Sequence, residues 1–193
     1  MLQQACRQAK AWHDAGLGDP VMAINISPRK FQHPDFMATV REALDSSGVD
    51  PRRIELEITE GAVMEEAEAT ITKMSELRAL GVYLAIDDFG TGYSSLAYLK
   101  RFPINRLKID RSFIQGLSHQ GEDAAIVKAL IQLAHSLGLT VVAEGVELAL
   151  QEACLRDWGC DLMQGFGYAR PLPVGDATAL LASTRPEALQ ALN

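Results

Sequence analysis

Polar residues that could carry out chemistry stand at the ends of several short apolar segments of the sequence. In chain order these residues are Asn25, Glu57 and Glu60, Asp87 and Asp88, Lys108 and Asp110, Glu144 and Glu147, and Gln164. Buried polar groups of this kind are costly unless they are paired or bound to a metal ion. One such residue alone would more often be a helix cap or a surface residue. Because they recur at six successive segments, they predict a functional site.

The residue types indicate which metal and which reaction to expect. Carboxylate and amide oxygens without nearby Cys or His suit Mg²⁺, Mn²⁺ or Ca²⁺ rather than zinc. An acidic cluster can hold two such ions about 3.5–4 Å apart and clamp the attacking and leaving oxygens of a phosphodiester. Glu144 then fits a general base, and Lys108 fits a cation that stabilises phosphoryl charge. The structural alternative for Lys108 is a salt bridge to Asp110 or to a neighbouring carboxylate.

A glycine-rich segment follows the adjacent acids at 87 and 88. It contains Phe89, Gly90, Thr91 and Gly92 and runs on to Ser95. The two glycines allow backbone geometries that other residues resist, and Ser94 or Ser95 could cap a following helix. The segment could cradle a phosphate, act as a hinge, or be an ordinary turn between a strand and a helix.

Strand-like and helix-like apolar patterns alternate along the chain and must position these residues. Strands are predicted at 21–26, 54–58, 82–86, 106–109, 140–143 and 160–163, and helices at 2–12, 34–44, 61–80, 94–101, 127–134, 148–158 and from about 174. Such alternation implies a parallel sheet with right-handed crossovers. Doubly wound and barrel folds both satisfy it. The barrel is favoured because the polar residues follow the carboxyl ends of the strands, where barrels place active sites.

Composition narrows the class of protein. The 193 residues predict one domain, and 48% hydrophobic with 22% charged residues is typical of an ordinary globular protein. A net charge of −7 without Lys or Arg clusters argues against nucleic acid as a partner. No apolar run approaches the roughly 18 residues of a membrane span, and no signal-peptide layout is present. Three cysteines without a CxxC pair predict a reduced, cytoplasmic setting. Without an apolar span, no membrane contact is expected from this segment.

Six motifs together resemble the EAL-type cyclic di-GMP phosphodiesterases in order and spacing. They are Asn25-Ile26-Ser27, Glu57-Ile58-Thr59-Glu60, the segment 87–95, Lys108-Ile109-Asp110, Ala143-Glu144-Gly145-Val146-Glu147, and Gln164-Gly165-Phe166. The similarity covers nearly all of the chain. It implies an α/β fold of the (β/α)8 TIM-like barrel type. It also implies Mg²⁺- or Mn²⁺-dependent hydrolysis of one phosphodiester of cyclic di-GMP, which gives linear pGpG.

The resemblance also implies a role for each matched residue at the metal centre. Asn25, Glu57 and Asp87 correspond to metal ligands, and Asp88 lies at or beside a second metal. Lys108 corresponds to the lysine that contacts the nucleophilic water, and Glu144 to the general base. Glu147, Gln164 and Asp110 correspond to residues that support the metal–phosphate site and bind substrate.

The glycine-rich loop has a different implied role in the family. Glu60 corresponds to the glutamate that holds this loop in place. In the family the loop and the helix after it are tied to dimerisation and to control of activity. A homodimer formed through them is therefore expected, with cyclic di-GMP as the ligand.

The family's first two strands and their helices have no match within residues 1–193, so a partial domain with about six of eight strands is expected. The missing part includes the Glu-Ala-Leu tripeptide, whose glutamate is a metal ligand. Glu42-Ala43-Leu44 and Glu187-Ala188-Leu189 spell the tripeptide, but both lie in helical segments at the wrong spacing. Unpaired strand edges would invite association of two copies.

The absent ligand keeps a second function open, a module that binds cyclic di-GMP without cleaving it. A third reading, independent of the family, is a Schiff-base aldolase with Lys108 as nucleophile. It is disfavoured because surrounding carboxylates would hold the lysine protonated.

Overall fold

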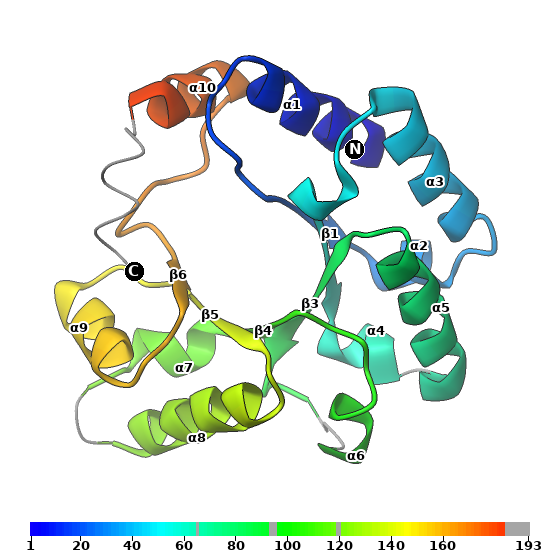
Figure 1. Cartoon of the computed structure of the whole chain (residues 1–193). Helices are drawn as coiled ribbons and strands as arrows, with labels where there is room; N and C mark the ends of the chain where they lie inside the picture. The colour runs from blue at the N-terminus through cyan, green and yellow to red at the C-terminus, as the bar shows by residue number, and fades with distance from the viewer. Residues whose placement is uncertain (65, 93–95, 119–120, 184–193) are drawn as a thin grey trace.

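The computed structural model describes residues 1–64, 66–92, 96–118 and 121–183. Its sheet has six parallel strands in the order β1-β2-β3-β4-β5-β6, the order in which they occur in the chain. They are β1 Met22–Ile26, β2 Ile54–Thr59, β3 Tyr83–Phe89, β4 Arg106–Ile109, β5 Thr140–Glu144 and β6 Leu162–Gln164. The sheet curves inside a ring of helices (Figure 1). The predicted parallel sheet of an incomplete barrel is confirmed.

Helices connect each strand to the next and lie outside the sheet. They are α1 Leu2–Asp14, α2 Pro28–Gln32, α3 Phe36–Ser47, the 3-10 turn η1 Pro51–Arg53, α4 Glu60–Met64, α5 Ala67–Ala79, α6 Leu96–Leu99, α7 Arg111–Gln115, α8 Glu122–Ser136, α9 Ala149–Asp157 and α10 Val174–Ser183. Among the described residues, no helix is long and apolar enough to cross a membrane.

The two faces of the sheet differ in chemistry because side chains alternate along each strand. Outward positions such as Ile58, Ile86 and Ile109 are fully buried in the apolar core against the helices. The inward positions between them carry the polar residues of the site. This alternation lets each strand anchor itself in the core with one face and present functional groups with the other.

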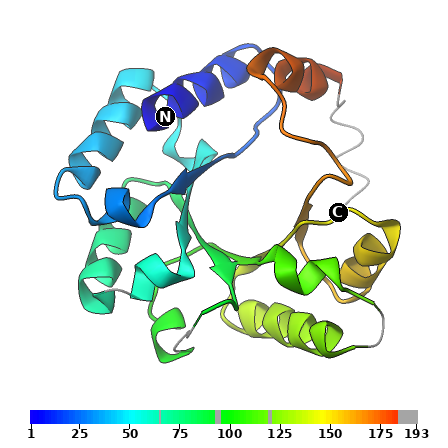
Figure 2. The same ribbon diagram turned by 180° about the vertical axis from the view of Figure 1, so that it is seen from behind.

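One side of the strand ring is open. Among the described residues, neither β1 nor β6 pairs with a further strand on its outer edge. Across this opening α1 and α10 lie side by side (Figures 1 and 2), and Trp12 Nε1 donates a hydrogen bond of 2.8 Å to Thr178 Oγ1. β6 and the segment after it are largely exposed, including Leu162 and Phe166.

Several predicted boundaries were wrong. The single helix predicted over 61–80 is two helices, α4 and α5, and Glu66 before α5 has a left-handed φ of 49°. The short helices α2 and α7 were missed because each has only five residues. The helix predicted from Pro34 begins at Phe36. The predicted start of α6 and its cap at Ser94 or Ser95 lie outside the described residues.

Candidate metal-binding and catalytic site

The predicted site residues meet because the carboxyl ends of all six strands lie at one edge of the curved sheet. Asn25 on β1 pairs in register with Glu57 on β2. Thr59 at the end of β2 pairs with Asp87 on β3. At the other side, Glu144 on β5 pairs with Gln164 on β6. Residues far apart in the sequence therefore surround one region inside the barrel.

Lys108 is the centre of this region. Its Nζ lies 2.8 Å from Glu57 Oε1, 3.0 Å from Asp87 Oδ1 and 2.7 Å from Glu144 Oε1. The residue is only 2% exposed. Of the two salt bridges considered from the sequence, the one to neighbouring carboxylates is present, whereas Asp110 contacts other groups.

The electrostatics of the cluster favour cations. Burial alone would lower the pKa of Lys108, but hydrogen bonds to Glu144 and Glu57 outweigh it and raise that pKa, so the ammonium stays charged. Burial raises the pKa of Glu57 and of Glu144 above the ordinary value of 4.5, although Lys108 acts in the opposite direction. One ammonium therefore faces three carboxylates, and the excess negative charge fits divalent cations with oxygen ligands.

Asn25 completes the ring of oxygen and nitrogen atoms on the β1 side. When its amide nitrogen faces the carboxylates, it donates to Asp87 Oδ2 at 3.0 Å and to Glu57 Oε2 at 3.3 Å. The amide end group is thus in direct contact with two predicted metal ligands. Rotation of the amide by half a turn would present its oxygen to a cation at the same place.

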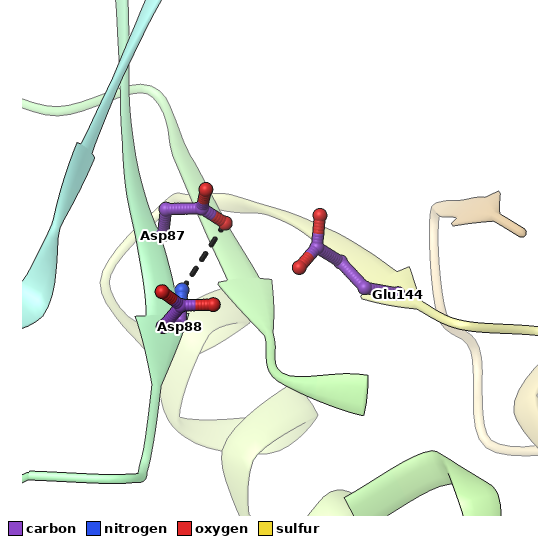
Figure 3. A group of neighbouring side chains, drawn as sticks. All are labelled: Asp87, Asp88 and Glu144. Atoms are coloured by element: carbon purple, nitrogen blue, oxygen red, sulfur yellow. Dashed lines mark hydrogen bonds between the residues drawn. The ribbon is translucent and has the colours of Figure 1, made fainter. Parts of the chain in front are cut away.

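Asp88 joins the site through an irregular backbone. Successive residues of a strand normally point to opposite faces, yet Figure 3 shows Asp87 and Asp88 on the same side as Glu144. Asp88 has a left-handed φ of 54°, and the register of β3 against β4 shifts between Ile86 and Phe89. One carboxylate oxygen from each of Asp87, Asp88 and Glu144 lies within 4.8 Å of the others, close enough to share a metal ion.

The left-handed backbone at Asp88 leads to a testable trade-off. Burial is the main cause of the raised pKa of Asp88, and the charges of Asp87 and Asp110 add to it. The backbone φ of Asp88 is also unfavourable for a residue with a side chain. We expect Asp88→Gly to raise the free energy of unfolding of the metal-free protein by about 1–3 kcal/mol. The same change should weaken Mn²⁺ binding.

Urea unfolding and calorimetric titration with Mn²⁺ measure the two effects. Asp88→Asn serves as the matched control, since it removes the charge and keeps a side chain. A glycine variant that is no more stable than the asparagine variant would contradict the role of backbone strain.

The supporting residues predicted from the sequence lie around this cluster in different ways. Asp110 caps α7 by accepting a hydrogen bond of 2.9 Å from the Ser112 backbone N–H. Hydrogen bonds from Ser112 lower the pKa of Asp110, although burial opposes them. Gln164 and Glu147 are exposed. The backbone oxygen of Gln164 accepts from Val146, which joins the two loops.

Glu60 contacts the glycine-rich loop. This glutamate is 3% exposed, and its Oε2 accepts a hydrogen bond of 2.8 Å from the Gly90 backbone. Gly90 has a φ of 100°, and a side chain at Gly92 would collide with Glu60 Oε1, 2.7 Å from the site of a Cβ. Thr91 Oγ1 donates to the backbone oxygen of Asp88 at 2.9 Å. The loop is thus tied both to Glu60 and to the acidic cluster.

Two charged residues near the site were missed from the sequence. Glu55 lies two residues before Glu57, and Arg106 lies two residues before Lys108. They form a further ion pair of 2.9 Å with Glu55 almost fully buried. The available signal was a charge at every second position of two otherwise apolar strands, which places all four side chains on the inner face.

Comparison with known proteins adds family evidence to this geometry. The family model of the EAL domain matches residues 1–171. The bifunctional diguanylate cyclase/cyclic di-GMP phosphodiesterase MucR of Pseudomonas aeruginosa is 46% identical over 183 residues, 95% of this chain and 26% of MucR. The solved structure of the PaMucR phosphodiesterase in complex with c-di-GMP has a TM-score of 0.88 at 45% identity, covering 91% of this chain and 71% of that one.

A second solved structure is Klebsiella pneumoniae BlrP1 in a manganese/cy-diGMP complex. Its TM-score is 0.77 at 35% identity, and the match covers 88% of this chain and 42% of that one. The chain spans about a quarter of the length of MucR, 26%. Because the family model covers most of its length, the chain belongs to the EAL domain family.

Proposed function

We propose that this EAL domain hydrolyses one phosphodiester of cyclic di-GMP to give linear pGpG, using Mg²⁺ or Mn²⁺. The observation that carries the proposal is the buried ammonium of Lys108 among the carboxylates of Glu57, Asp87 and Glu144 at the mouth of the barrel. Further support comes from two solved structures of similar proteins. One is PaMucR in complex with c-di-GMP, and the other is BlrP1 in complex with manganese and cy-diGMP.

The proposed metal ligands are Asn25, Glu57, Asp87 and Asp88, whose end groups surround the cluster. Bound divalent ions would supply Lewis-acid activation of water and neutralise phosphoryl charge. Gln164, Glu147 and Asp110, at the rim, are proposed to orient the nucleotide. Gln164 and Glu147 are exposed, which leaves them accessible for this contact.

Glu144 is the proposed general base. The pKa of Glu144 is raised, mainly by burial. Its carboxylate therefore accepts a proton more readily than that of an ordinary glutamate, as a general base must. Lys108 Nζ lies 2.7 Å from the Glu144 carboxylate and fixes its orientation.

The same contacts argue against a Schiff-base reaction at Lys108. A nucleophilic lysine must lose its proton, which needs an apolar or cationic environment. Here hydrogen bonds to Glu144 and Glu57 outweigh burial and raise the pKa of Lys108. The ammonium is therefore suited to stabilise negative charge instead.

Positively charged residues lie near the end of β1. A cavity of about 520 Å³ opens next to the end of β1 and is lined by Ile26, Ser27, Arg29, Lys30 and His33, among others. This volume is within the usual range of small-molecule sites. Arg29 and Lys30 would suit an anionic group there, although no residue of the acidic cluster lines this cavity.

The proposed reaction is tested by incubating the protein with cyclic di-GMP and Mn²⁺ and separating the products by chromatography. We expect pGpG to form and its formation to stop when EDTA removes the metal. Binding of cyclic di-GMP without any turnover would instead identify a non-catalytic binding module.

Mn²⁺ binding should strengthen as pH rises. Burial raises the folded-state pKa of Glu57 and Glu144 above 4.5, so both hold protons to a higher pH than ordinary glutamates. A metal ion must displace those protons. Calorimetric titration with Mn²⁺ between about pH 5 and 8 measures the trend. An affinity that is constant over this range would contradict it.

We also propose that the domain acts as a homodimer in the cytoplasm. The glycine-rich loop and α6 are the proposed contact, and the loop is held in a defined place by Glu60. Free thiols at Cys6, Cys154 and Cys160 support a reducing compartment. Two further strands, pairing with β1 and β6, are proposed to close the barrel in the complete domain. Light scattering and gel filtration measure the oligomeric state.

A further inference from the structure

A second ion pair lies beneath the catalytic cluster, inside the barrel. Arg106 Nη1 is 2.9 Å from Glu55 Oε2, and the Glu55 side chain is only 3% exposed. The Arg106 guanidinium also lies over the Tyr83 ring, with its Cζ 5.8 Å from the ring centre. The inner face therefore carries two layers of charge, Glu57 with Lys108 above and Glu55 with Arg106 below.

Both ion pairs cross over β3, because β2 and β4 lie on its two sides. Neighbouring strands are about 4.8 Å apart, so each pair must span roughly 10 Å of sheet. The inner residue of β3 at this level is Ala85, which pairs in register with Glu57 on one side and with Arg106 on the other. Its small side chain leaves room for the long side chains to meet.

Stability alone does not explain why the ion pair of Glu55 and Arg106 is present. Layers inside such barrels are usually filled by branched apolar residues. A buried ion pair is often no more stabilising than apolar residues of similar volume. Glu55, however, lies two residues from Glu57, a separation of about 6.6 Å along the strand. Without a partner of its own, Glu55 would be a fourth carboxylate within reach of the Lys108 side chain.

We propose that Arg106 is a positioning residue that, by pairing with Glu55, keeps Lys108 on Glu57, Asp87 and Glu144. This inference rests on the proposed function, because it concerns the same lysine. Arg106 does not touch the reacting groups itself. It removes a competing acceptor from the layer below, so that the ammonium remains beside the proposed base.

Crystal structures of two variants test the positioning directly. In Arg106→Gln we expect Lys108 Nζ to leave Glu144 and to contact Glu55. In the double variant Glu55→Gln/Arg106→Gln, which lacks both charges, we expect Lys108 to return to Glu144. An unchanged Lys108 in Arg106→Gln would overturn the proposal. If that variant does not fold, Arg106→Lys replaces it; there Lys108 should stay on Glu144, and its displacement would count against the proposal.

Kinetics provide the second arm. We expect Arg106→Gln to lower kcat for cyclic di-GMP about 10–100-fold, the usual effect of a residue that orients another, with KM nearly unchanged. The double variant should recover most of this loss. A merely structural role predicts that the double variant is at least as impaired as the single one.

An exposed ion pair supplies the matched control. Glu68 and Arg101 lie 2.6 Å apart with both side chains at least half exposed. Arg101→Gln and Glu68→Gln/Arg101→Gln should leave kcat and the Lys108 contacts unchanged. A wild-type protein that cleaves no cyclic di-GMP would refute the proposed function, whereas the crystal structures would still decide the role of Arg106.

Discussion

Replacing Glu144 by Gln is expected to slow hydrolysis of cyclic di-GMP by about 10²- to 10⁴-fold, the usual contribution of a general base. Gln has nearly the same shape but cannot accept a proton. Its amide can still contact Lys108, which lies 2.7 Å from the Glu144 carboxylate. Binding of the nucleotide should therefore persist while turnover is lost. Initial rates of pGpG formation with saturating Mn²⁺ measure the effect.

The control for this change is Glu152→Gln on α9. Glu152 is a glutamate on the helix that follows β5, where it pairs with Arg156 at 2.6 Å on the surface. It should have no effect on the rate. If Glu144→Gln and Glu152→Gln had equal rates, Glu144 could not be the base.

Lys108→Met should give the largest change in stability. Met keeps an unbranched side chain but removes the ammonium, which leaves Glu57, Asp87 and Glu144 without their shared partner in a buried region. Breaking a buried ion pair by removing one partner typically costs about 3–5 kcal/mol. We expect the free energy of unfolding of the metal-free protein near neutral pH to fall by this amount, as measured with urea.

Acid and metal ions should each reverse this loss. The folded-state pKa values of Glu57 and Glu144 are raised by burial. Both groups therefore favour folding when protonated, and stability falls as pH rises from 4.5 through the raised values. Without Lys108 this fall should be steeper. Mn²⁺ should stabilise the variant more than the wild type. Equal stability of the variant and the wild type at neutral pH without metal would contradict the central place of Lys108.

The location of the site could be predicted from the sequence, because it follows from two simple regularities. Parallel strands bring their carboxyl ends to one edge, so Asn25, Glu57, Asp87 and Glu144 had to lie near one another once the strands were recognised. Alternation along a strand separates a face with Ile58 and Ile86 in the core from a face with the polar residues. The alternation is a local property of each strand, and the shared edge follows from the parallel topology.

Other features depend on contacts that no local pattern contains. The position of Asp88 results from a left-handed backbone and a register shift against β4. The pairing of Arg106 with Glu55 skips a strand and requires the small Ala85 between them. The split between α4 and α5 was hidden because the apolar spacing of 61–80 continues through Glu66. Such features depend on tertiary structure and can be seen only when the strands are assembled.

The most direct test of a metal centre at these strand ends is anomalous diffraction from crystals grown with Mn²⁺. We expect one peak in contact with the carboxylate oxygens of Asp87 and Asp88, which lie within 4.8 Å of each other and of a Glu144 oxygen. A second peak should lie about 3.5–4 Å from the first if two ions act together. Peaks only at other surfaces, with the Lys108 contacts unchanged, would contradict a metal-dependent phosphodiesterase site here.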